Sequence, residues 1–267
     1  MRARKALGQH FLRDKGLLDR IAAASGAMAG EVVLEIGPGQ GSLTTALLDT
    51  GATVVAIERD ARMTAQLTRD HHAASFVLVE GDALELDWPS LVSPWTSQGA
   101  SWRVVGNIPY YITSPLLDKA LTSPMPASIT FLVQEEVARR LVAEPGGEDY
   151  GALTIGVSAV ADVSIAMRVG RGAFVPPPKV DSAVIHLVPR AEPLVPPDRI
   201  PDFRRLVVSI FSYRRKRMLR ALREARGLVA DSAASFLAAA GIDPDLRPEV
   251  LDPAAFVRLL GVLDSGD

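Results

Sequence analysis

A chain of 267 residues, of which 48% are apolar, is long enough to bury the core of one α/β domain and to carry a small additional domain. It contains no cysteine, so disulfide frameworks, thiolate metal sites and cysteine nucleophiles are excluded. The net charge of −2 does not by itself indicate a polyanionic partner, although the basic residues are concentrated in two segments.

The first basic segment is the N-terminus, where residues 1–20 contain six basic side chains against two acidic ones. This segment has no apolar run that could act as the core of a signal peptide. No later segment has the roughly 18 uninterrupted apolar residues that a membrane helix needs. We therefore expect a soluble, cytoplasmic protein without membrane contact.

Short β-branched segments alternate with helix-like segments through the first two thirds of the chain. Strands separated by helical segments indicate a parallel, doubly wound sheet of the Rossmann-like kind. The expected strands are residues 31–36, 52–58, 75–82, 101–107, 127–134 and 181–188.

The first expected strand runs into a glycine turn that contains Gly37, Gly39 and Gly41, and a helix is expected from about Ser42. Glycine lets the backbone pass close to a ligand because no Cβ intervenes. Ser42 stands where the dinucleotide fingerprint has its last glycine, and Pro38 lies inside the turn, so an adenosylmethionine site is favoured over a pyrophosphate site. An isolated glycine triplet is equally compatible with a plain turn.

Two carboxylates follow the glycine turn in an order that suits a nucleoside. Glu58 ends the next expected strand, where an acidic side chain can accept hydrogen bonds from two ribose hydroxyls. Asp82 closes the third expected strand, where its carboxylate can accept a hydrogen bond from an adenine amine. Strand, turn, helix and acidic strand ends in this order favour a nucleotide-like cofactor over a plain turn.

The fourth expected strand ends in Asn107-Ile108-Pro109-Tyr110. The N6 amine of adenine is a weak nucleophile, so its methylation requires acceptors that align it, which Asn107 Oδ1 and the Ile108 carbonyl can provide. Pro109 fixes its own φ, and Tyr110 can stack on a base extruded from its helix. The motif also suits an ordinary turn, and related motifs serve DNA, RNA, protein and small-molecule methylation.

A proline-rich linker at 193–203 divides the chain into a catalytic domain, 1–192, which opens with the basic segment 1–25, and a helical domain, 204–267. The helical domain shows apolar residues at three-to-four spacing, with Asp231 and Asp252 as expected N-caps. Residues 203–226 contain nine basic residues against one acidic residue. Such helices are often solvated surfaces, but four adjacent cations would surround a helix, which favours phosphate contact by Arg214, Arg215, Lys216 and Arg217.

Several separate stretches resemble the rRNA adenine N6,N6-dimethyltransferase family, whose members are Rossmann-like class I methyltransferases that use S-adenosylmethionine. The resemblance implies that Gln9, His10 and Leu12 close over the cofactor, that Phe174 offers a second aromatic face to the target adenine, and that Lys179 lies close to RNA. Phe174 as a buried core residue is the alternative. The matching stretches are Lys5–Leu12, Glu35–Gly41, Glu58, Gly81–Asp82, Asn107–Tyr110, Gln134–Arg140, Tyr150–Gly151 and Phe174–Ser182.

The C-terminal stretches Phe211–Lys216, Gly241–Asp243 and Arg247–Glu249 are similar to the KsgA-type branch of that family. This similarity implies dimethylation of two adjacent adenines near the 3′ end of small-subunit (16S) rRNA, in an immature small ribosomal subunit. Tyr111 departs from the family pattern, in which a polar residue is common at this position. The chain is expected to be a monomer without a metal.

Three alternatives remain open from the sequence. The first is a large-subunit rRNA adenine methyltransferase of the antibiotic-resistance type. The second is a non-catalytic ribosome-assembly or transcription factor that keeps the fold, which the intact Asn107 and Tyr110 disfavour. The third is an NAD-dependent oxidoreductase, which Ser42 and Pro38 disfavour.

Overall fold

The structure is a computed structural model that describes residues 8–265. The part of the basic N-terminal segment in residues 1–7 therefore lies outside the described residues. The chain forms two compact units. The first consists of the residues up to Ala138 together with Ser164–Pro189, and the second consists of Arg139–Val163 together with the residues from Arg190 onward.

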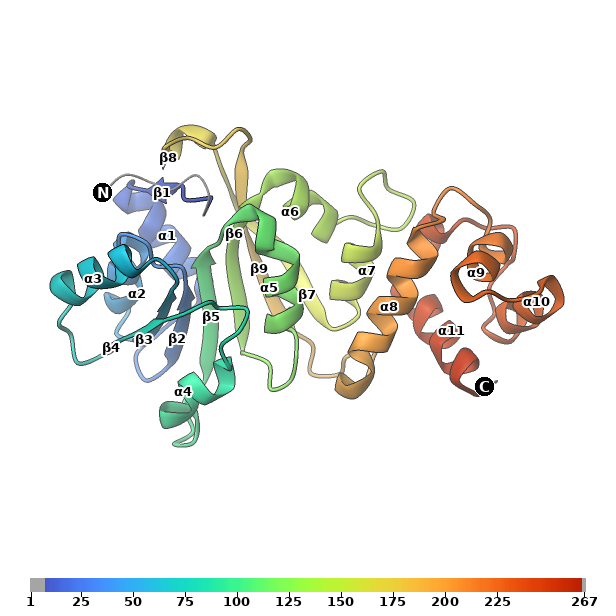
Figure 1. The fold of residues 1–267 in the computed structure, drawn as a ribbon, viewed down its shortest axis with the longest axis horizontal. Coiled ribbons are helices and arrows are strands. Elements are labelled where there is room, and N and C mark those ends of the chain that lie inside the picture. Colours follow the sequence, from blue (N-terminus) through green and yellow to red (C-terminus); the bar gives the residue numbers. More distant parts are fainter. Residues whose placement is uncertain (1–7, 266–267) are drawn as a thin grey trace. The chain divides into compact units, whose positions relative to one another are not determined.

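One mixed sheet contains seven strands, which are β2 (Val32–Ile36), β3 (Thr53–Glu58), β4 (Phe76–Glu80), β5 (Trp102–Asn107), β6 (Ser128–Gln134), β7 (Ala161–Val169) and β9 (Ser182–Pro189). The strand order is β4-β3-β2-β5-β6-β9-β7 (Figure 1). The five strands from β4 to β6 pair in parallel, and β9 pairs antiparallel with β6.

This topology confirms the Rossmann-like α/β class, and the antiparallel strand β9 makes the predicted parallel sheet a mixed one. Parallel neighbours need a crossover connection, usually a helix. Between β7 and β9 the chain forms only the short 3-10 helix η3 (Arg171–Ala173) and the strand β8 (Phe174–Val175), so no helix carries the chain back to the starting edge. The strand β7 was not among the predicted strands, although its apolar and polar residues alternate as they do in a strand with one buried face.

The helices that accompany these strands are α1 (Lys15–Ser25), α2 (Ser42–Leu48), α3 (Ala61–Asp70), α4 (Trp88–Thr96), α5 (Thr113–Ala120) and α6 (Glu135–Leu141). Two of them begin at an aspartate that accepts a hydrogen bond from the first turn: Asp14 from the Leu17 N–H and Asp60 from the Arg62 N–H. The central strands β2 and β3 are almost completely buried, as strands covered on both faces are.

A second, very small sheet pairs two segments that are far apart in the sequence. The strand β1 (Phe11–Leu12) pairs antiparallel with β8, with Phe11 opposite Val175 and Leu12 opposite Phe174. Two residues are too few for a periodic pattern, so this pairing could not be predicted from the sequence. The pairing holds the N-terminal segment beside the loop that precedes β9 (Figure 1).

The second unit is helical, apart from the start of β7. Its α-helices are α7 (Ala152–Ser158), α8 (Ile200–Phe211), α9 (Met218–Arg226), α10 (Ala230–Ala239) and α11 (Pro253–Ser265), with 3-10 turns η4 (Pro197–Arg199) and η5 (Pro248–Val250). Residues 139–163 group with this unit because α7 packs against α8. The sequence had predicted the domain boundary at a linker in residues 193–203.

Two details of the helical region differ from the expectations. Asp252 does accept a hydrogen bond of 2.7 Å from the Ala255 N–H at the start of α11, but Asp231 lies inside the first turn of α10, whose N-cap is Val229. Residues 212–217 form a turn between α8 and α9, so the four adjacent cations do not surround a helix. Within residues 8–265, no helix is both long and apolar enough to span a bilayer.

Candidate active site

The carboxyl ends of β2, β3 and β5 open into a cavity of the first unit, beside the N-terminal segment. Ligands of open α/β sheets bind at these strand ends. The space inside measures about 1160 Å³, including the solvent at its mouth. The lining residues are Gly8–Leu12, Leu18, Glu35–Gln40, Ser42, Leu43, Ile57–Arg59, Gly81–Leu84 and Asn107–Ile112.

The glycine turn forms one wall of this cavity. Gly37, Gly39 and Gly41 all have positive φ, at +68°, +58° and +82°. A Cβ on Gly37 would meet nothing within 4 Å and would occupy open space, whereas one on Gly41 would lie 2.5 Å from His71 Nε2. Gly41 does not line the cavity. Gly37 and Gly39 therefore form the cradle, and Gly41 is required by packing against α3.

Glu58 is held in place by the turn. Its Oε2 accepts a hydrogen bond of 3.0 Å from the Gly39 N–H, and its Oε1 accepts one of 2.8 Å from the Asp60 N–H. Burial raises the pKa of Glu58, and these main-chain donors act against that rise. Each carboxylate oxygen has a second acceptor position, so the group can still accept hydrogen bonds from a diol.

Glu35 is a buried carboxyl group beside the cavity that the sequence analysis did not single out. Burial raises the pKa of Glu35 to about 8, against the opposing hydrogen bond from Thr44 Oγ1 at 2.6 Å. The sequence signal that could have identified Glu35 is a single acidic residue within an otherwise apolar strand. Glu35 is therefore protonated near neutral pH.

Asp82 lines the same cavity as the glycine turn and is paired with another residue of the lining. Its Oδ2 lies 2.9 Å from Arg59 Nη1, and its Oδ1 accepts a hydrogen bond of 3.0 Å from the Leu84 N–H. The Arg59 side chain is mostly exposed, so the pair is loosely held. An incoming amine can therefore compete for this carboxylate.

The end of β5 brings a side-chain amide to the edge of the cavity. Asn107 Nδ2 donates a hydrogen bond of 2.8 Å to the carbonyl oxygen of His10. Ile108 is buried, and Pro109 (φ −59°, ψ 131°) precedes the 3-10 turn η2 (Tyr110–Ile112). Because Nδ2 is engaged, Oδ1 of Asn107 is the atom that can accept from a ligand.

Tyr110 is half-buried at the same edge. Its hydroxyl lies 2.6 Å from Ser182 Oγ on β9, and its ring stacks on His10 with the ring centres 6.1 Å apart. Burial raises the pKa of Tyr110. The hydroxyl contact with Ser182 joins residues 72 positions apart and could not be expected from local sequence.

Phe174 does not have the surroundings that were expected of it. Its side chain is 2% exposed and lies in the core cluster with Leu12, Leu18 and Val184. It does not line the cavity. The burial of the ring favours the alternative stated for Phe174, a core residue, over a face offered to a base.

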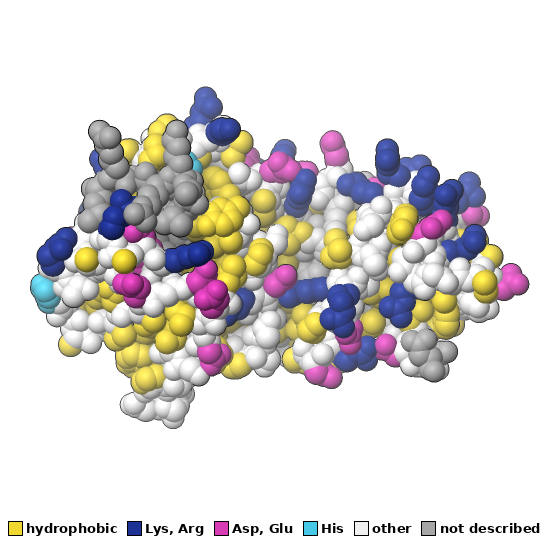
Figure 2. All heavy atoms as spheres, in the orientation of Figure 1, with side chains coloured by type: hydrophobic (Ala, Val, Ile, Leu, Met, Phe, Trp, Pro, Cys, Tyr) yellow, Lys and Arg dark blue, Asp and Glu magenta, His cyan; other side chains and the backbone are white. Residues whose placement is uncertain are grey.

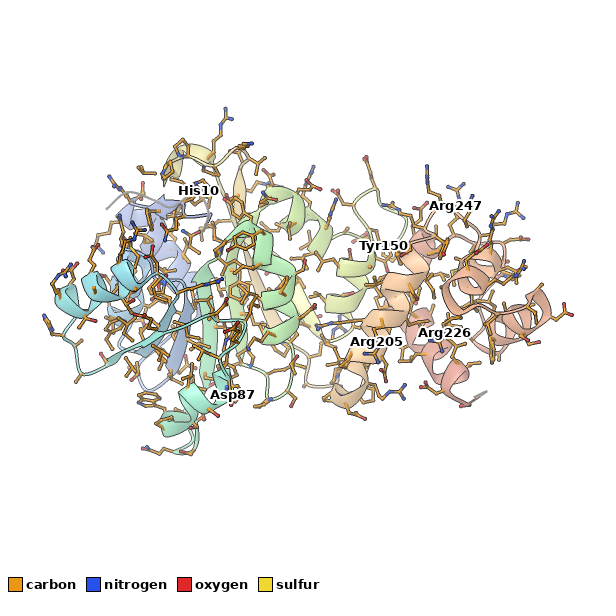
Figure 3. The ribbon with its side chains drawn as sticks, viewed as in Figure 1. His10, Asp87, Tyr150, Arg205, Arg226 and Arg247 are labelled. Atoms are coloured by element: carbon orange, nitrogen blue, oxygen red, sulfur yellow. The ribbon has the colours of Figure 1, made fainter. Side chains whose placement is uncertain are left out.

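The three N-terminal residues expected at the cofactor do lie along the cavity. Gln9 Nε2 donates a hydrogen bond of 3.2 Å to Asp60, just beyond Glu58. His10 is labelled in Figure 3. Its Nδ1 lies 2.8 Å from the Pro176 carbonyl oxygen, which makes Nδ1 the protonated nitrogen. Leu12 is buried and contributes apolar wall.

The basic residues expected at RNA are exposed. Lys179 lies in the loop between β8 and β9, and the other four lie in the turn between α8 and α9. Arg214 pairs with Glu249 at 3.1 Å and Arg217 with Asp245 at 2.8 Å. Within residues 8–265, Arg215 and Lys216 make no ion pair. Figure 2 shows basic side chains gathered around this turn and α9, where Figure 3 labels Arg247 and Arg226.

Comparison with known proteins identifies the family of the chain. The sequence model of the family described as "Ribosomal RNA adenine dimethylase" matches residues 1–258. The chain belongs to this family. This match confirms the family that the sequence motifs had indicated. Among residues 8–265, no group of three or more His, Asp or Glu residues could hold a metal ion.

Relatives and solved structures match this dimethylase along nearly its whole length. The Ribosomal RNA small subunit methyltransferase A of Pseudomonas aeruginosa is 45% identical over 98% of this chain and 95% of its own. The enzyme of the same name from Phenylobacterium zucineum is 43% identical over 96% of this chain and 87% of its own. A dimethyladenosine transferase from Plasmodium falciparum superposes with a TM-score of 0.82, at 26% identity over 96% and 98%. The 23S rRNA methyltransferase ErmE superposes with a TM-score of 0.69, at 29% identity over 95% of this chain and 99% of its own.

Proposed function

We propose that this protein transfers methyl groups from S-adenosylmethionine to N6 of two adjacent adenines near the 3′ end of small-subunit (16S) rRNA, within an immature small ribosomal subunit. One observation carries the chemistry: Asn107 Oδ1 is left as an acceptor at the cavity edge, because Nδ2 is engaged by His10. The identity of 42–45% to small-subunit enzymes over nearly the full length supports the substrate.

The lining of the cavity fits the cofactor. Glu58 would accept hydrogen bonds from the ribose hydroxyls, Asp82 from the adenine amine, and the open space at Gly37 would admit the methionine part. Gln9, His10 and Leu12 would close the site from the N-terminal side. When bound, S-adenosylmethionine supplies an activated methyl group on a cationic sulfur.

The protein's own contribution to the reaction is positioning. Asn107 Oδ1 and the carbonyl of Ile108 would accept the two hydrogens of the adenine amine and direct its lone pair toward the methyl group. Pro109 limits the freedom of that corner, and the ring of Tyr110 would contact the extruded base. Holding two reactants in line and away from water is sufficient to accelerate such a transfer.

Exposed cations supply the contact with RNA. Lys179 in the first unit and Arg215 and Lys216 in the second are exposed, and their charge and exposure support a role in phosphate contact. Arg214 and Arg217 are partly neutralised by Glu249 and Asp245, so we assign them a smaller share. We infer that the protein acts in the cytoplasm as a monomer and that its macromolecular partner is the ribosomal substrate.

Incubation with radiolabelled S-adenosylmethionine and small subunits that lack the modification tests this function. We expect label in N6,N6-dimethyladenosine, and primer extension that maps it to two neighbouring adenines of 16S rRNA. Label in 23S rRNA instead would favour the resistance-type function, to which the 29% identity with ErmE points. Cofactor binding without any label in RNA would favour a non-catalytic assembly factor.

A further inference from the structure

Tyr111 is an aromatic side chain at the cavity mouth to which the proposed reaction gives no task. It lines the cavity together with Tyr110, yet its side chain is 61% exposed. Every aromatic residue of the chain lies within residues 8–265, and there Tyr111 is the one that is exposed. Because this ring lies beside a binding cavity, it offers an exposed aromatic face to a ligand that enters there.

The two consecutive tyrosines have different surroundings. Tyr110 is fixed inward by Ser182 and by its stack on His10. Successive side chains of a 3-10 helix point about 120° apart, so the turn η2 that directs Tyr110 inward must direct Tyr111 elsewhere. The turn thus provides one aromatic ring inside the cavity edge and one outside it.

The ring of Tyr111 is supported on one side. A Cβ built on Gly8 would lie 3.4 Å from Tyr111 Cε1 and 3.5 Å from the Pro109 side chain. Gly8 has a φ of +61°, so a larger residue there would be strained as well as crowded. The backbone at Gly8 therefore packs beside the ring, and 61% of the Tyr111 side chain is still exposed.

We propose that Tyr111 stacks on the rRNA nucleobase next to the adenine held in the site. This inference rests on the proposed function and adds a substrate contact to it. When one of two neighbouring adenines is extruded into the cavity, its neighbour must lie at the mouth, and the adjacent ring in the same turn meets it there. Stacking accepts any base, so Tyr111 serves whichever adenine is outside.

Three substitutions separate stacking from other contributions of Tyr111. Tyr111→Phe keeps the aromatic face, Tyr111→Leu keeps apolar area without it, and Tyr111→Ala removes both. Base stacking on an aromatic ring corresponds to about 5- to 150-fold in binding. We expect kcat/KM for undermethylated subunits to fall by roughly this factor in the Ala and Leu variants, mainly through KM, and to stay within about twofold in the Phe variant. Met28→Ala removes another exposed apolar side chain, 56% exposed and outside the cavity, and should have no effect.

A direct measurement uses an RNA oligonucleotide with 2-aminopurine beside the target adenine. Stacking on Tyr111 should change its fluorescence when wild-type protein binds, and the change should be absent with Tyr111→Ala. The Kd for S-adenosylmethionine should be the same in all variants. Equal KM values and equal fluorescence in wild type and Tyr111→Ala would overturn this inference alone, whereas wild-type protein that methylates no rRNA would overturn the proposed function as well.

Discussion

The side-chain nitrogen of Asn107 donates a hydrogen bond to the carbonyl oxygen of His10, 97 residues earlier in the chain. This contact joins the end of β5 to the N-terminal segment, so it couples the proposed amine acceptor to the segment that borders the cofactor cavity. It also fixes the rotation of the amide, because the opposite rotation would place two oxygens against each other.

Replacing Asn107 should abolish methyl transfer and preserve binding. Loss of one aligned polar group at a reacting centre costs about 100- to 1000-fold in kcat, so we expect at least a 100-fold decrease for Asn107→Ala. The Kd for S-adenosylmethionine, measured by calorimetry, should change little. Asn107→Asp is a matched variant that retains acceptors but cannot donate to His10, and its activity should fall too. Normal turnover in Asn107→Ala would remove Asn107 from the reaction.

The positions of the cavity residues were predictable because parallel strands end at one edge of a sheet. Glu58 and Asn107 end such strands and Asp82 follows one, and the structure brings all three to the cavity. The contacts that orient them were not predictable. Asn107 with His10 and Tyr110 with Ser182 each join residues dozens of positions apart, and no local pattern records such pairs.

Two surroundings seen in the structure were not predicted from the sequence, namely those of Phe174 and of the cations 214–217. Phe174 is buried because two residues of β1 pair with β8, a pairing too short to leave a period in the sequence. The cations 214–217 lie in a turn because α8 ends at Phe211 and α9 starts only at Met218. The sequence predicted the cluster of cations, but it did not predict the conformation of the backbone that carries them.

Gly37 and Gly30 form a pair that separates backbone strain from loss of ligand space. Both have positive φ, at +68° and +85°, and neither would bring a new Cβ within 4 Å of another atom. Alanine at either position should therefore destabilise the fold by a similar amount, about 1 to 2 kcal/mol. Only Gly37 lines the cavity. We expect Gly37→Ala to weaken cofactor binding by at least tenfold in calorimetry, while Gly30→Ala binds normally.

Glu35 should make the stability of the protein depend on pH. Its pKa is about 8 in the folded chain, raised by burial, and 4.5 is its ordinary value. Between these values the folded state holds a proton that the unfolded state has lost, so stability decreases as pH rises from about 4.5 to about 8. Glu35→Gln removes this loss and keeps an acceptor for Thr44.

Urea unfolding at several pH values checks this expectation. Near pH 5 the two proteins should have similar free energies of unfolding. The advantage of Glu35→Gln should grow with pH and level off above about pH 8, at an order of a few kcal/mol. A difference between the proteins that does not vary with pH would show that Glu35 is ionised when folded.

Arg215 and Lys216 should contribute to RNA binding through charge. Each phosphate contact adds about 0.7 to the slope of log affinity against log salt for a single strand. The double variant Arg215→Ala/Lys216→Ala should therefore reduce the slope by about 1 to 2 and weaken binding most at low salt. Arg69→Ala removes an exposed cation of α3 and should leave the slope unchanged. Identical slopes in all three proteins would exclude this turn from the interface.

Phe174 provides a test of burial against base contact. As a core residue that packs with Leu12 and Val184, it should lose about 3 to 5 kcal/mol of stability on truncation to alanine. Phe174→Leu keeps most of the buried volume and should fold with only a moderate decrease in Tm. Because the ring does not reach the cavity, the KM for undermethylated subunits should be unchanged in the leucine variant. A large rise in KM with normal stability would instead mean that the ring leaves the core to meet the base, since only a π face is lost in that substitution.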